Sequence, residues 1–463
     1  MADTDEVLSR LAATEAAAQA RWLDWLRIPS VSAQPAHAAD CRRAAEFARS
    51  ELEALGFQAT LRETQGHPVV VAHHPGPPGG IGPHLLYYGH YDVQPADPLE
   101  LWHSPPFEPV VTEGPHGPRV VARGAVDDKG QVSMWLAAFR AWFEETGSMP
   151  VRITAIIEGE EEIGSENLED FLATNRAELA ADVAIVSDTD MWDIDTPAIC
   201  TSLRGLVYMQ VDLQAAGRDL HSGMFGGSAL NPINALTRAL GALHDAEGRV
   251  QLDGFYDGVT EVSREQAAQW ATLGFDEGAF LGAIGLSVPA GERNRGGLER
   301  LWARPTADIN GIWGGYAGAG SKTVIAATAG AKVSFRLVPG QQPERIAEAF
   351  RAFMRARVPA DAKLSFQTFG QAPGMAVAQD APVIAAARHA LADEFGRPAV
   401  LIGGGGSIPV VEAFKRLLGL DTLLMGFGLN DDQIHSPNEK FEVRCFRHGT
   451  RSHVRLLGLL AGG

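Results

Sequence analysis

Short apolar runs alternate with segments of helical periodicity over the first two hundred or so residues, and this alternation is the strongest constraint on the fold. Helical spacing of apolar side chains recurs at residues 131–145 and near 167–181. The apolar runs between such segments cover residues 69–72, 85–88, 151–157 and 183–187. Strands that alternate with helices favour an α/β sheet that is at least partly parallel. We therefore predict an α/β protein.

The periodicity changes near residue 206, which indicates a second domain. Residues 206–215 alternate apolar and polar side chains, as expected for a strand with one solvated face. Similar alternation and helical patterns follow at 231–244, 324–329, 331–338 and 343–358. These pieces fit a small α+β layer of residues 206–375, inserted into a larger domain formed by residues 1–205 and 376–463. Residues 251–300 have too weak a periodicity to predict elements there.

Charge and cysteine content exclude several classes of protein. The chain has 39 Lys and Arg against 57 Asp and Glu, a net charge of −18, whereas nucleic-acid and anionic-membrane binders need a basic surface. Cys41, Cys200 and Cys445 form no CxxC pair, so neither a disulfide framework nor a cysteine zinc site is expected. The sequence has no signal-peptide pattern and no apolar run of the roughly 18 residues that cross a bilayer. We expect a cytoplasmic protein with no membrane or nucleic-acid partner.

Histidines and carboxylates follow the ends of the apolar runs. In open α/β sheets the ligand crevice lies outside the carboxyl ends of the strands, so these side chains are expected to meet on one rim. Crowded carboxylates raise each other's pKa unless cations neutralise them. Histidines among carboxylates suit zinc, manganese or cobalt better than calcium or magnesium. The sequence therefore predicts a bound pair of metal ions near His90, Asp92, Asp127, Asp128, Glu158, Glu160, Glu161, Glu162, Asp188, Asp190 and His435.

Each of these patterns also has a common structural explanation. His90 and Asp92 could form a hydrogen-bonded pair in the core. The glutamate run at 160–162 could begin a helix, where acidic residues interact favourably with the helix dipole. Asp127-Asp128 could form a turn and an N-cap, and Asp188 could cap the next helix. Their joint occurrence at successive strand ends favours the metal site.

Five motifs, in order along the chain, give the sequence its resemblance to a known family. They are GHYDVQP at 89–95, RGAVDDKG at 123–130, EGEEEIGS at 158–165, DLHSG at 219–223 and HSPNE at 435–439. This set resembles the M20 metallopeptidases, and within them the cytosolic nonspecific dipeptidases and carnosinases. The resemblance implies a zinc-exopeptidase-like catalytic domain with a mixed central sheet (1–205 and 376–463). It also implies an inserted ferredoxin-like α+β lid and dimerisation domain (206–375).

The family pattern implies a complete set of metal ligands. By this resemblance His90 and Asp188 hold one divalent ion, Glu162 and His435 hold the other, and Asp127 bridges the two. Zn²⁺ is the expected metal, with Mn²⁺ or Co²⁺ as alternatives. The cations bring a charge of +4 and the three ligand carboxylates −3, so a bridging hydroxide makes the cluster neutral. That balance favours ionisation of the bridging water near neutral pH.

The resemblance also implies catalytic roles. Asp92 would orient His90, a contact of the kind that fixes the tautomer of a metal-binding histidine. Glu161 would be the general base that takes a proton from the attacking water and returns it to the leaving amine. His221 would stabilise the oxyanion in the active site of the other subunit of a homodimer.

Substrate-binding positions follow from the same resemblance. Thr323, Arg336 and Ser407 match substrate-contacting positions of the family, and Arg336 is the candidate for the free carboxylate of a small peptide. The family scaffold also serves N-acyl-amino-acid deacylases and succinyl-diaminopimelate desuccinylases, which remain alternatives for the substrate. A non-catalytic binding protein is a third hypothesis, although such a relative is expected to have lost a ligand or the general base.

Overall fold

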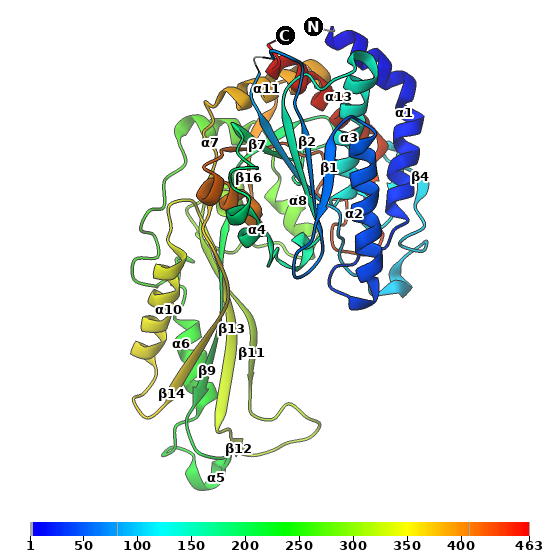
Figure 1. Cartoon of the computed structure of the whole chain (residues 1–463). Coiled ribbons are helices and arrows are strands. Elements are labelled where there is room, and N and C mark those ends of the chain that lie inside the picture. The colour runs from blue at the N-terminus through cyan, green and yellow to red at the C-terminus, as the bar shows by residue number, and fades with distance from the viewer. Residues whose placement is uncertain (1–2, 81, 407, 463) are drawn as a thin grey trace. The chain divides into compact units, whose positions relative to one another are not determined.

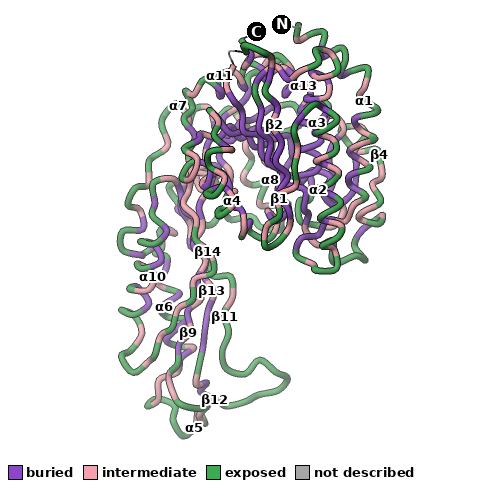
Figure 2. The backbone as a smooth tube through the Cα atoms, in the orientation of Figure 1, coloured by how far each residue is buried: buried purple, intermediate pink, exposed green. Residues whose placement is uncertain are grey.

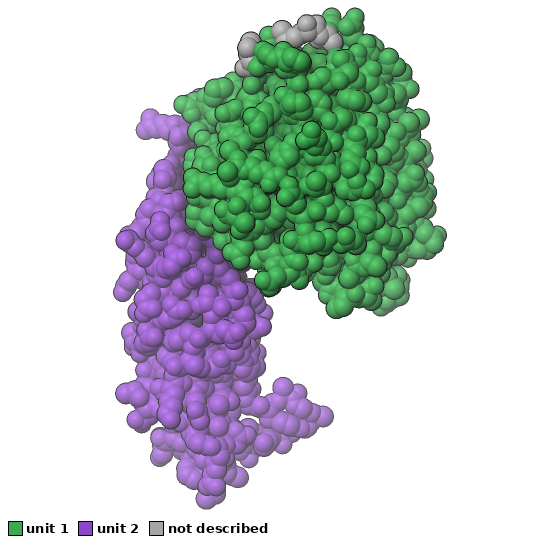
Figure 3. Space-filling model, in the orientation of Figure 1, with its two compact units in different colours: residues 1–201, 377–402, 409–463 green, residues 202–376, 403–408 purple. Residues whose placement is uncertain are grey.

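The computed structural model describes residues 3–80, 82–406 and 408–462. The contacts divide the chain into two compact units (Figure 3). Unit 1 comprises Met1–Thr201, Val377–Ile402 and Pro409–Gly463. Unit 2 comprises Ser202–Ala376 and Gly403–Ile408. The predicted α/β class with a mixed central sheet is confirmed.

A mixed nine-stranded sheet includes the centre of unit 1, with its strands in the order β1-β2-β6-β3-β7-β17-β8-β15. Strand β16, Val400–Gly404, also pairs with β8, and β15 is Met375–Ala376. Strands β3, β6, β7 and β17 are parallel to their neighbours within this group, whereas β1, β2 and β8 pair in an antiparallel way. The bounds are β1 Gln58–Arg62, β2 Val69–His74, β3 Leu85–His90, β6 Ile153–Glu158, β7 Val183–Val186, β8 Ala198–Leu203 and β17 Thr422–Leu424. The parallel strands therefore end at one common edge.

Helices cover both faces of this sheet, which explains why its strands are continuously apolar. Tyr87 of β3 packs against Trp135 of α3 at a ring distance of 4.9 Å, whereas Tyr88 contacts Phe414 on the opposite face at 5.7 Å. The buried sheet is visible at the centre of unit 1 (Figure 2). The helices of this unit are α1 Thr4–Leu26, α2 Ala38–Glu53, α3 Lys129–Thr146, α4 Leu168–Thr174, α11 Pro382–Phe395, α12 Pro409–Ala413 and α13 Val443–Leu460.

Unit 1 also contains a second, smaller sheet and a helix that ends earlier than expected. A small antiparallel sheet has the order β18-β5-β4, formed by Lys440–Glu442, Gly117–Val121 and Val110–Gly114. Helix α4 is shorter than predicted because the Asn175 side chain donates a hydrogen bond to the Phe171 carbonyl and ends the helix. No helix of the described residues is both long and apolar enough to span a lipid bilayer.

Unit 2 contains a four-stranded antiparallel sheet in the order β11-β13-β9-β14 (Figure 1). Alternate residues of β9 and β13, such as Val207 and Phe335, are buried against helices α6 and α10. The strands are β9 Gly205–Gln214, β11 Thr306–Gly314, β13 Thr328–Leu337 and β14 Lys363–Ala372, with short strands β10 Leu220–His221 and β12 Val324–Ile325. The helices are α5 Ser222–Phe225, α6 Pro232–Gly241, α7 Arg264–Ala271, α8 Glu277–Gly282, α9 Gly297–Trp302 and α10 Pro343–Arg357.

The segment without clear periodicity, residues 251–300, contains the short helices α7 and α8 and the start of α9. Ion pairs hold much of it together. Arg300 of α9 pairs with Glu277 of α8, and Glu292 contacts Arg304, just beyond the segment, at 2.9 Å, with both of these side chains buried. Because short helices tied together by charges have no long apolar stripe, periodicity alone could not reveal them.

Candidate metal centre

The ends of several strands bring the predicted ligands of unit 1 together. β3 ends at His90, and β6 ends at Glu158 just before the short helix Glu161–Ile163 that carries Glu162. Asp188 follows β7 by two residues. Asp127 lies in the loop between β5 and α3, and His435 lies in the loop between β17 and β18. The carboxyl edge of the sheet thus holds all five side chains.

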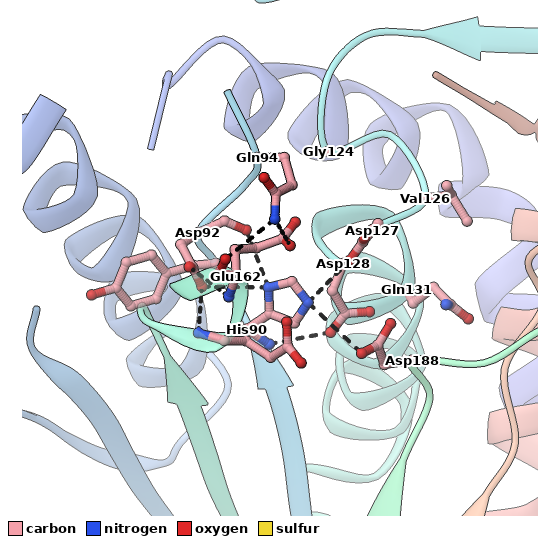
Figure 4. Close-up of polar contacts among 12 residues, drawn as sticks. His90, Asp92, Gln94, Gly124, Val126, Asp127, Asp128, Gln131, Glu162 and Asp188 are labelled. Carbon is pink, nitrogen blue, oxygen red and sulfur yellow. Dashed lines mark hydrogen bonds and ion pairs between the residues drawn. The ribbon is translucent and has the colours of Figure 1, made fainter. Parts of the chain in front are cut away.

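Asp127 is shared between two histidines, and Figure 4 shows it beside His90. Its Oδ1 lies 3.1 Å from Nε2 of His90, and its Oδ2 lies 3.0 Å from Nε2 of His435. Asp188 Oδ2 lies 3.9 Å from the same His90 nitrogen, and Glu162 Oε2 lies 3.1 Å from the same His435 nitrogen. Two groups of three potential ligands result, each with its ligand atoms within 4.8 Å of one another, and Asp127 belongs to both.

The donor atoms fit a pair of metal ions. His90 is fully buried, and its Nε2 makes no hydrogen bond. An unbonded buried nitrogen is costly unless another partner satisfies it. The His90 Nδ1 lies 3.1 Å from the backbone oxygen of Asp92. A proton on Nδ1 therefore leaves the lone pair on Nε2 free to face Asp127 and Asp188, as a metal ligand requires.

Electrostatics around these ligands also favours cations. Burial and the neighbouring Asp127 raise the pKa of Asp188 to about 7. Burial raises the pKa of Glu162, and hydrogen bonds with Asp127 and Glu162 raise the pKa of His435 to about 10. Burial opposes ionisation of Asp127, but the hydrogen bond with His435 and the close approach of His90 hold its pKa below the usual value. In the metal-free protein, protons bound to these side chains offset the negative charge that metal ions would otherwise neutralise.

Asp92 contacts the backbone around the predicted base. Its Oδ1 accepts a hydrogen bond from the Glu161 amide at 3.3 Å, and its Oδ2 accepts one from the Glu162 amide at 3.1 Å. The Asp92 carboxylate is 3.4 Å from Nδ1 of His90, farther than its own carbonyl oxygen. Asp92 therefore positions both the histidine and the turn that carries the two glutamates.

Sequence reasoning gave no positioning role to three residues that contact the predicted ligands or the loops that carry them. The Gln94 amide donates a hydrogen bond to Glu162 Oε2 at 2.8 Å, and Asp128 Oδ2 accepts one from the backbone amide of His90 at 3.1 Å. The fully buried Glu439 accepts hydrogen bonds from the loop that precedes Asp127. All three lie inside the motifs that carried the resemblance, and Asp128 is also one of the carboxylates expected beyond the strand ends.

The remaining predicted residues belong to unit 2 or fall outside the described residues. His221 is exposed in β10, and its Nδ1 accepts a hydrogen bond from the Gly223 amide at 3.0 Å. Thr323 is close to it along the paired strand, because its carbonyl accepts a hydrogen bond from the Ser222 amide at 3.0 Å. Arg336 lies in β13, opposite Leu206 of β9, and lines a cavity of about 650 Å³ within unit 2. Ser407 lies outside the described residues.

The sequence matches the model of peptidase family M20/M25/M40 over residues 86–458, and the chain belongs to this family. It is a metallopeptidase, a class of hydrolase whose M20 members bind metal ions. The Cys-Gly metallodipeptidase dug1 of Schizosaccharomyces pombe is 30% identical over 437 residues, covering 92% of this chain and 91% of the relative. The human Beta-Ala-His dipeptidase is 30% identical over 79% of this chain and 73% of its own length.

The fold has a close counterpart among solved structures. The structure of the di-peptidase Dug1p from Saccharomyces cerevisiae matches with a TM-score of 0.81 and 26% sequence identity, over 100% of this chain and 99% of that one. The resemblance to M20 dipeptidases is therefore confirmed by both sequence and fold.

Metal binding by the metal-free protein is expected to release more protons at pH 6 than at pH 8. Because burial raises the pKa of Asp188 to about 7, this carboxyl is mostly protonated at pH 6 and mostly ionised at pH 8. Its proton must leave before it can bind Zn²⁺, so the apparent affinity should rise with pH over this range. Calorimetric titration with Zn²⁺ in buffers of different ionisation enthalpy measures the protons released. Equal proton release at both pH values would contradict Asp188 as a ligand.

Proposed function

We propose that the chain is a dinuclear metal-dependent dipeptidase, in which His90, Asp188, Glu162 and His435 bind two divalent ions bridged by Asp127. The observation that carries this proposal is the position of Asp127, whose two carboxylate oxygens lie 3.1 and 3.0 Å from two different histidines. A carboxylate placed in this way suits two metal ions better than one. Zn²⁺ is the proposed metal, since histidine with carboxylate ligands is common for it, and Mn²⁺ or Co²⁺ suits the same donors.

A pair of divalent ions in such a site polarises the scissile carbonyl and lowers the pKa of water. Glu161 then acts as the general base. It lies next to the ligand Glu162, and its backbone is fixed by Asp92. Burial raises the pKa of the Glu161 carboxyl well above its usual value, which makes the carboxylate a stronger base. An oxygen of Glu161 takes the proton of the attacking water and then gives it to the nitrogen of the leaving amine.

The substitution Glu161→Gln is expected to leave metal content and fold unchanged but to lower kcat by roughly 10²–10⁴-fold, the usual contribution of general-base catalysis. The amide has nearly the same shape but cannot accept the proton. Elemental analysis and peptide hydrolysis assays measure the two effects. Glu166→Gln, an exposed glutamate five residues away, is the matched control and should keep normal activity. Full activity of Glu161→Gln would exclude Glu161 as the base.

Dipeptides with a free carboxylate are the proposed substrates. Two relatives are named for dipeptides, Cys-Gly and Beta-Ala-His. Arg336 has no carboxylate partner among the ion pairs of the described residues, which leaves its guanidinium free to bind a substrate carboxylate. This position of Arg336 in the cavity supports the proposal that the protein is an exopeptidase, which binds the terminal carboxylate of a short peptide.

The metal-loaded protein is expected to cleave alanyl dipeptides with a higher kcat/KM than N-acetyl- or N-succinyl-amino acids. The physical reason is that the amine and the carboxylate of a dipeptide are both charged, whereas the acyl substrates lack the amine. Parallel assays of both substrate groups with Zn²⁺, Mn²⁺ and Co²⁺ provide the test. Faster hydrolysis of the acyl-amino acids would assign the protein to the deacylase alternative.

The arrangement of unit 2 supports a homodimer with shared active sites. Leu206 of β9 pairs with Arg336, whereas Gln214, eight residues along the strand, pairs with Thr328. His221 pairs with Val324 of β12, four residues before Thr328, and Figure 1 shows β12 and α5 together at one end of unit 2. At about 3.4 Å per residue, His221 and Arg336 are on the order of 25 Å apart. A dipeptide spans only about 7 Å, so one copy of unit 2 cannot supply both residues to the same substrate.

An exposed edge strand supports the same proposal. Strand β11 pairs only with β13, so one of its sides is unpaired among the described strands. Ile309, Ile312 and Trp313 on this strand are 47%, 52% and 42% exposed. An edge strand with exposed apolar side chains is a favourable surface for association with another chain. We propose that a second copy covers it and contributes His221 to the neighbouring site.

Mixing two inactive variants is expected to restore activity. Glu161→Gln lacks the base in its own site, and His221→Ala lacks the residue that it supplies to its partner. In a mixed dimer one of the two sites has both groups intact, so random exchange should restore about a quarter of normal activity. Peptide hydrolysis after subunit exchange measures this, with each variant alone as the control. No rescue in verified mixed dimers would contradict the shared site.

A further inference from the structure

Glu439 is a fully buried carboxylate immediately before β18, four residues after His435. It lies in the HSPNE motif, which contributed to the resemblance, and it is neither a proposed metal ligand nor the proposed base. All of its side-chain hydrogen bonds go to one short segment, residues 123–127. That segment ends at Asp127, the shared ligand.

Both oxygens of Glu439 are fully used. Oε2 accepts hydrogen bonds from Nη1 of Arg123 at 2.7 Å and from the Gly124 amide at 2.9 Å. Oε1 accepts hydrogen bonds from the amides of Val126 at 3.0 Å and Asp127 at 3.2 Å. Three backbone amides, those of Gly124, Val126 and Asp127, and one guanidinium thus converge on a single carboxylate, much as backbone amides hold an anion in a nest.

Backbone contacts link Glu439 to the two chain segments that carry Asp127 and His435. The Ala122 amide donates a hydrogen bond to the Glu439 carbonyl at 3.1 Å, and Lys440 pairs with Val121. The loop that leads into Glu439 carries His435, whose φ of 61° is rare for a residue with a side chain. Such a conformation is kept only when its surroundings hold it in place.

We infer that Glu439 is a positioning residue that fixes the bridging carboxylate of Asp127 relative to His435, so that the two metal ions bind as a coupled pair. This inference rests on the proposed metal pair. Without the four bonds to Glu439, the segment 123–127 could turn Asp127 away from one of the two histidines. Residues that orient ligands in this way typically change metal affinity by about 10–100-fold when they are replaced.

The test compares Glu439→Gln with the wild-type protein by calorimetric titration of the metal-free forms with Zn²⁺ alone. The amide keeps the shape of the side chain, but its NH₂ group would face two donors instead of accepting from them. We expect the Kd of the weaker-binding Zn²⁺ to rise by about 10–100-fold. We also expect kcat to be largely recovered at high Zn²⁺. Glu394→Gln is the matched control, because Glu394 also has a buried carboxylate that pairs with arginine. Its ion-pair partners lie on helix α13, so the Zn²⁺ affinity of this variant should be unchanged.

Circular dichroism of the metal-free variants separates misfolding from loss of positioning. If Glu439→Gln does not fold, Glu439→Asp keeps the charge but is too short to reach all four donors, and it should show the same loss of affinity to a smaller degree. Two equivalents of Zn²⁺ bound with wild-type affinity by a folded Glu439→Gln, or by Glu439→Asp where Gln fails, would overturn the inference. A wild-type protein that binds no Zn²⁺ would instead overturn the proposed function on which it rests.

Discussion

Repulsion between carboxylates at one edge of a sheet is the constraint on which the rest of this structure depends. Burial raises the pKa of Glu161 and, together with neighbouring acids, that of Asp188, while Asp127 remains ionised only through its contacts with two histidines. A protein gains no stability from gathering buried acids unless positive charge compensates them. The buried acids therefore lower the stability of the fold when no cation is present, and a cation site explains why they are there.

Residues around the predicted ligands hold the ligand loops in place through hydrogen bonds. Asp92 and Gln94 hold the turn that carries the glutamates, and Asp128 accepts a hydrogen bond from the backbone of His90. Glu439 does the same for the segment that ends at Asp127. Each of these groups is itself hydrogen-bonded to the backbone, so the ligand geometry depends on main-chain positions rather than on flexible side chains.

Sequence reasoning succeeded where local pattern and topology agree. A run of buried residues such as 85–88 must be a strand of a covered sheet, and a polar residue directly after it, such as His90, must lie at the sheet edge. The predicted helices at 131–145 and 343–358 correspond to α3 and α10 within two residues. These strands and helices are determined by residues close together in the sequence, and the periodicity of apolar residues reveals them.

Features that depend on tertiary contacts could not be predicted in this way. The hydrogen bonds of Glu439 join segments more than three hundred residues apart, and no spacing in the sequence encodes that partnership. Helices α7, α8 and α9 are short, and an ion pair between Arg300 and Glu277 connects α9 to α8, so they have no long apolar stripe to detect. Helix α4 ended early through a single side-chain contact of Asn175.

The position of β17 has a consequence for biosynthesis. This strand, Thr422–Leu424, is inserted beside β7 in the middle of the sheet, although it is made more than two hundred residues later. A chain emerging from the ribosome therefore cannot close its central sheet until residues 422–424 have been made, and pairings between such distant segments form slowly. Premature termination before residue 422 leaves an open gap in the hydrophobic interior, so truncated products should be substrates for chaperones and proteolysis rather than partially active enzymes.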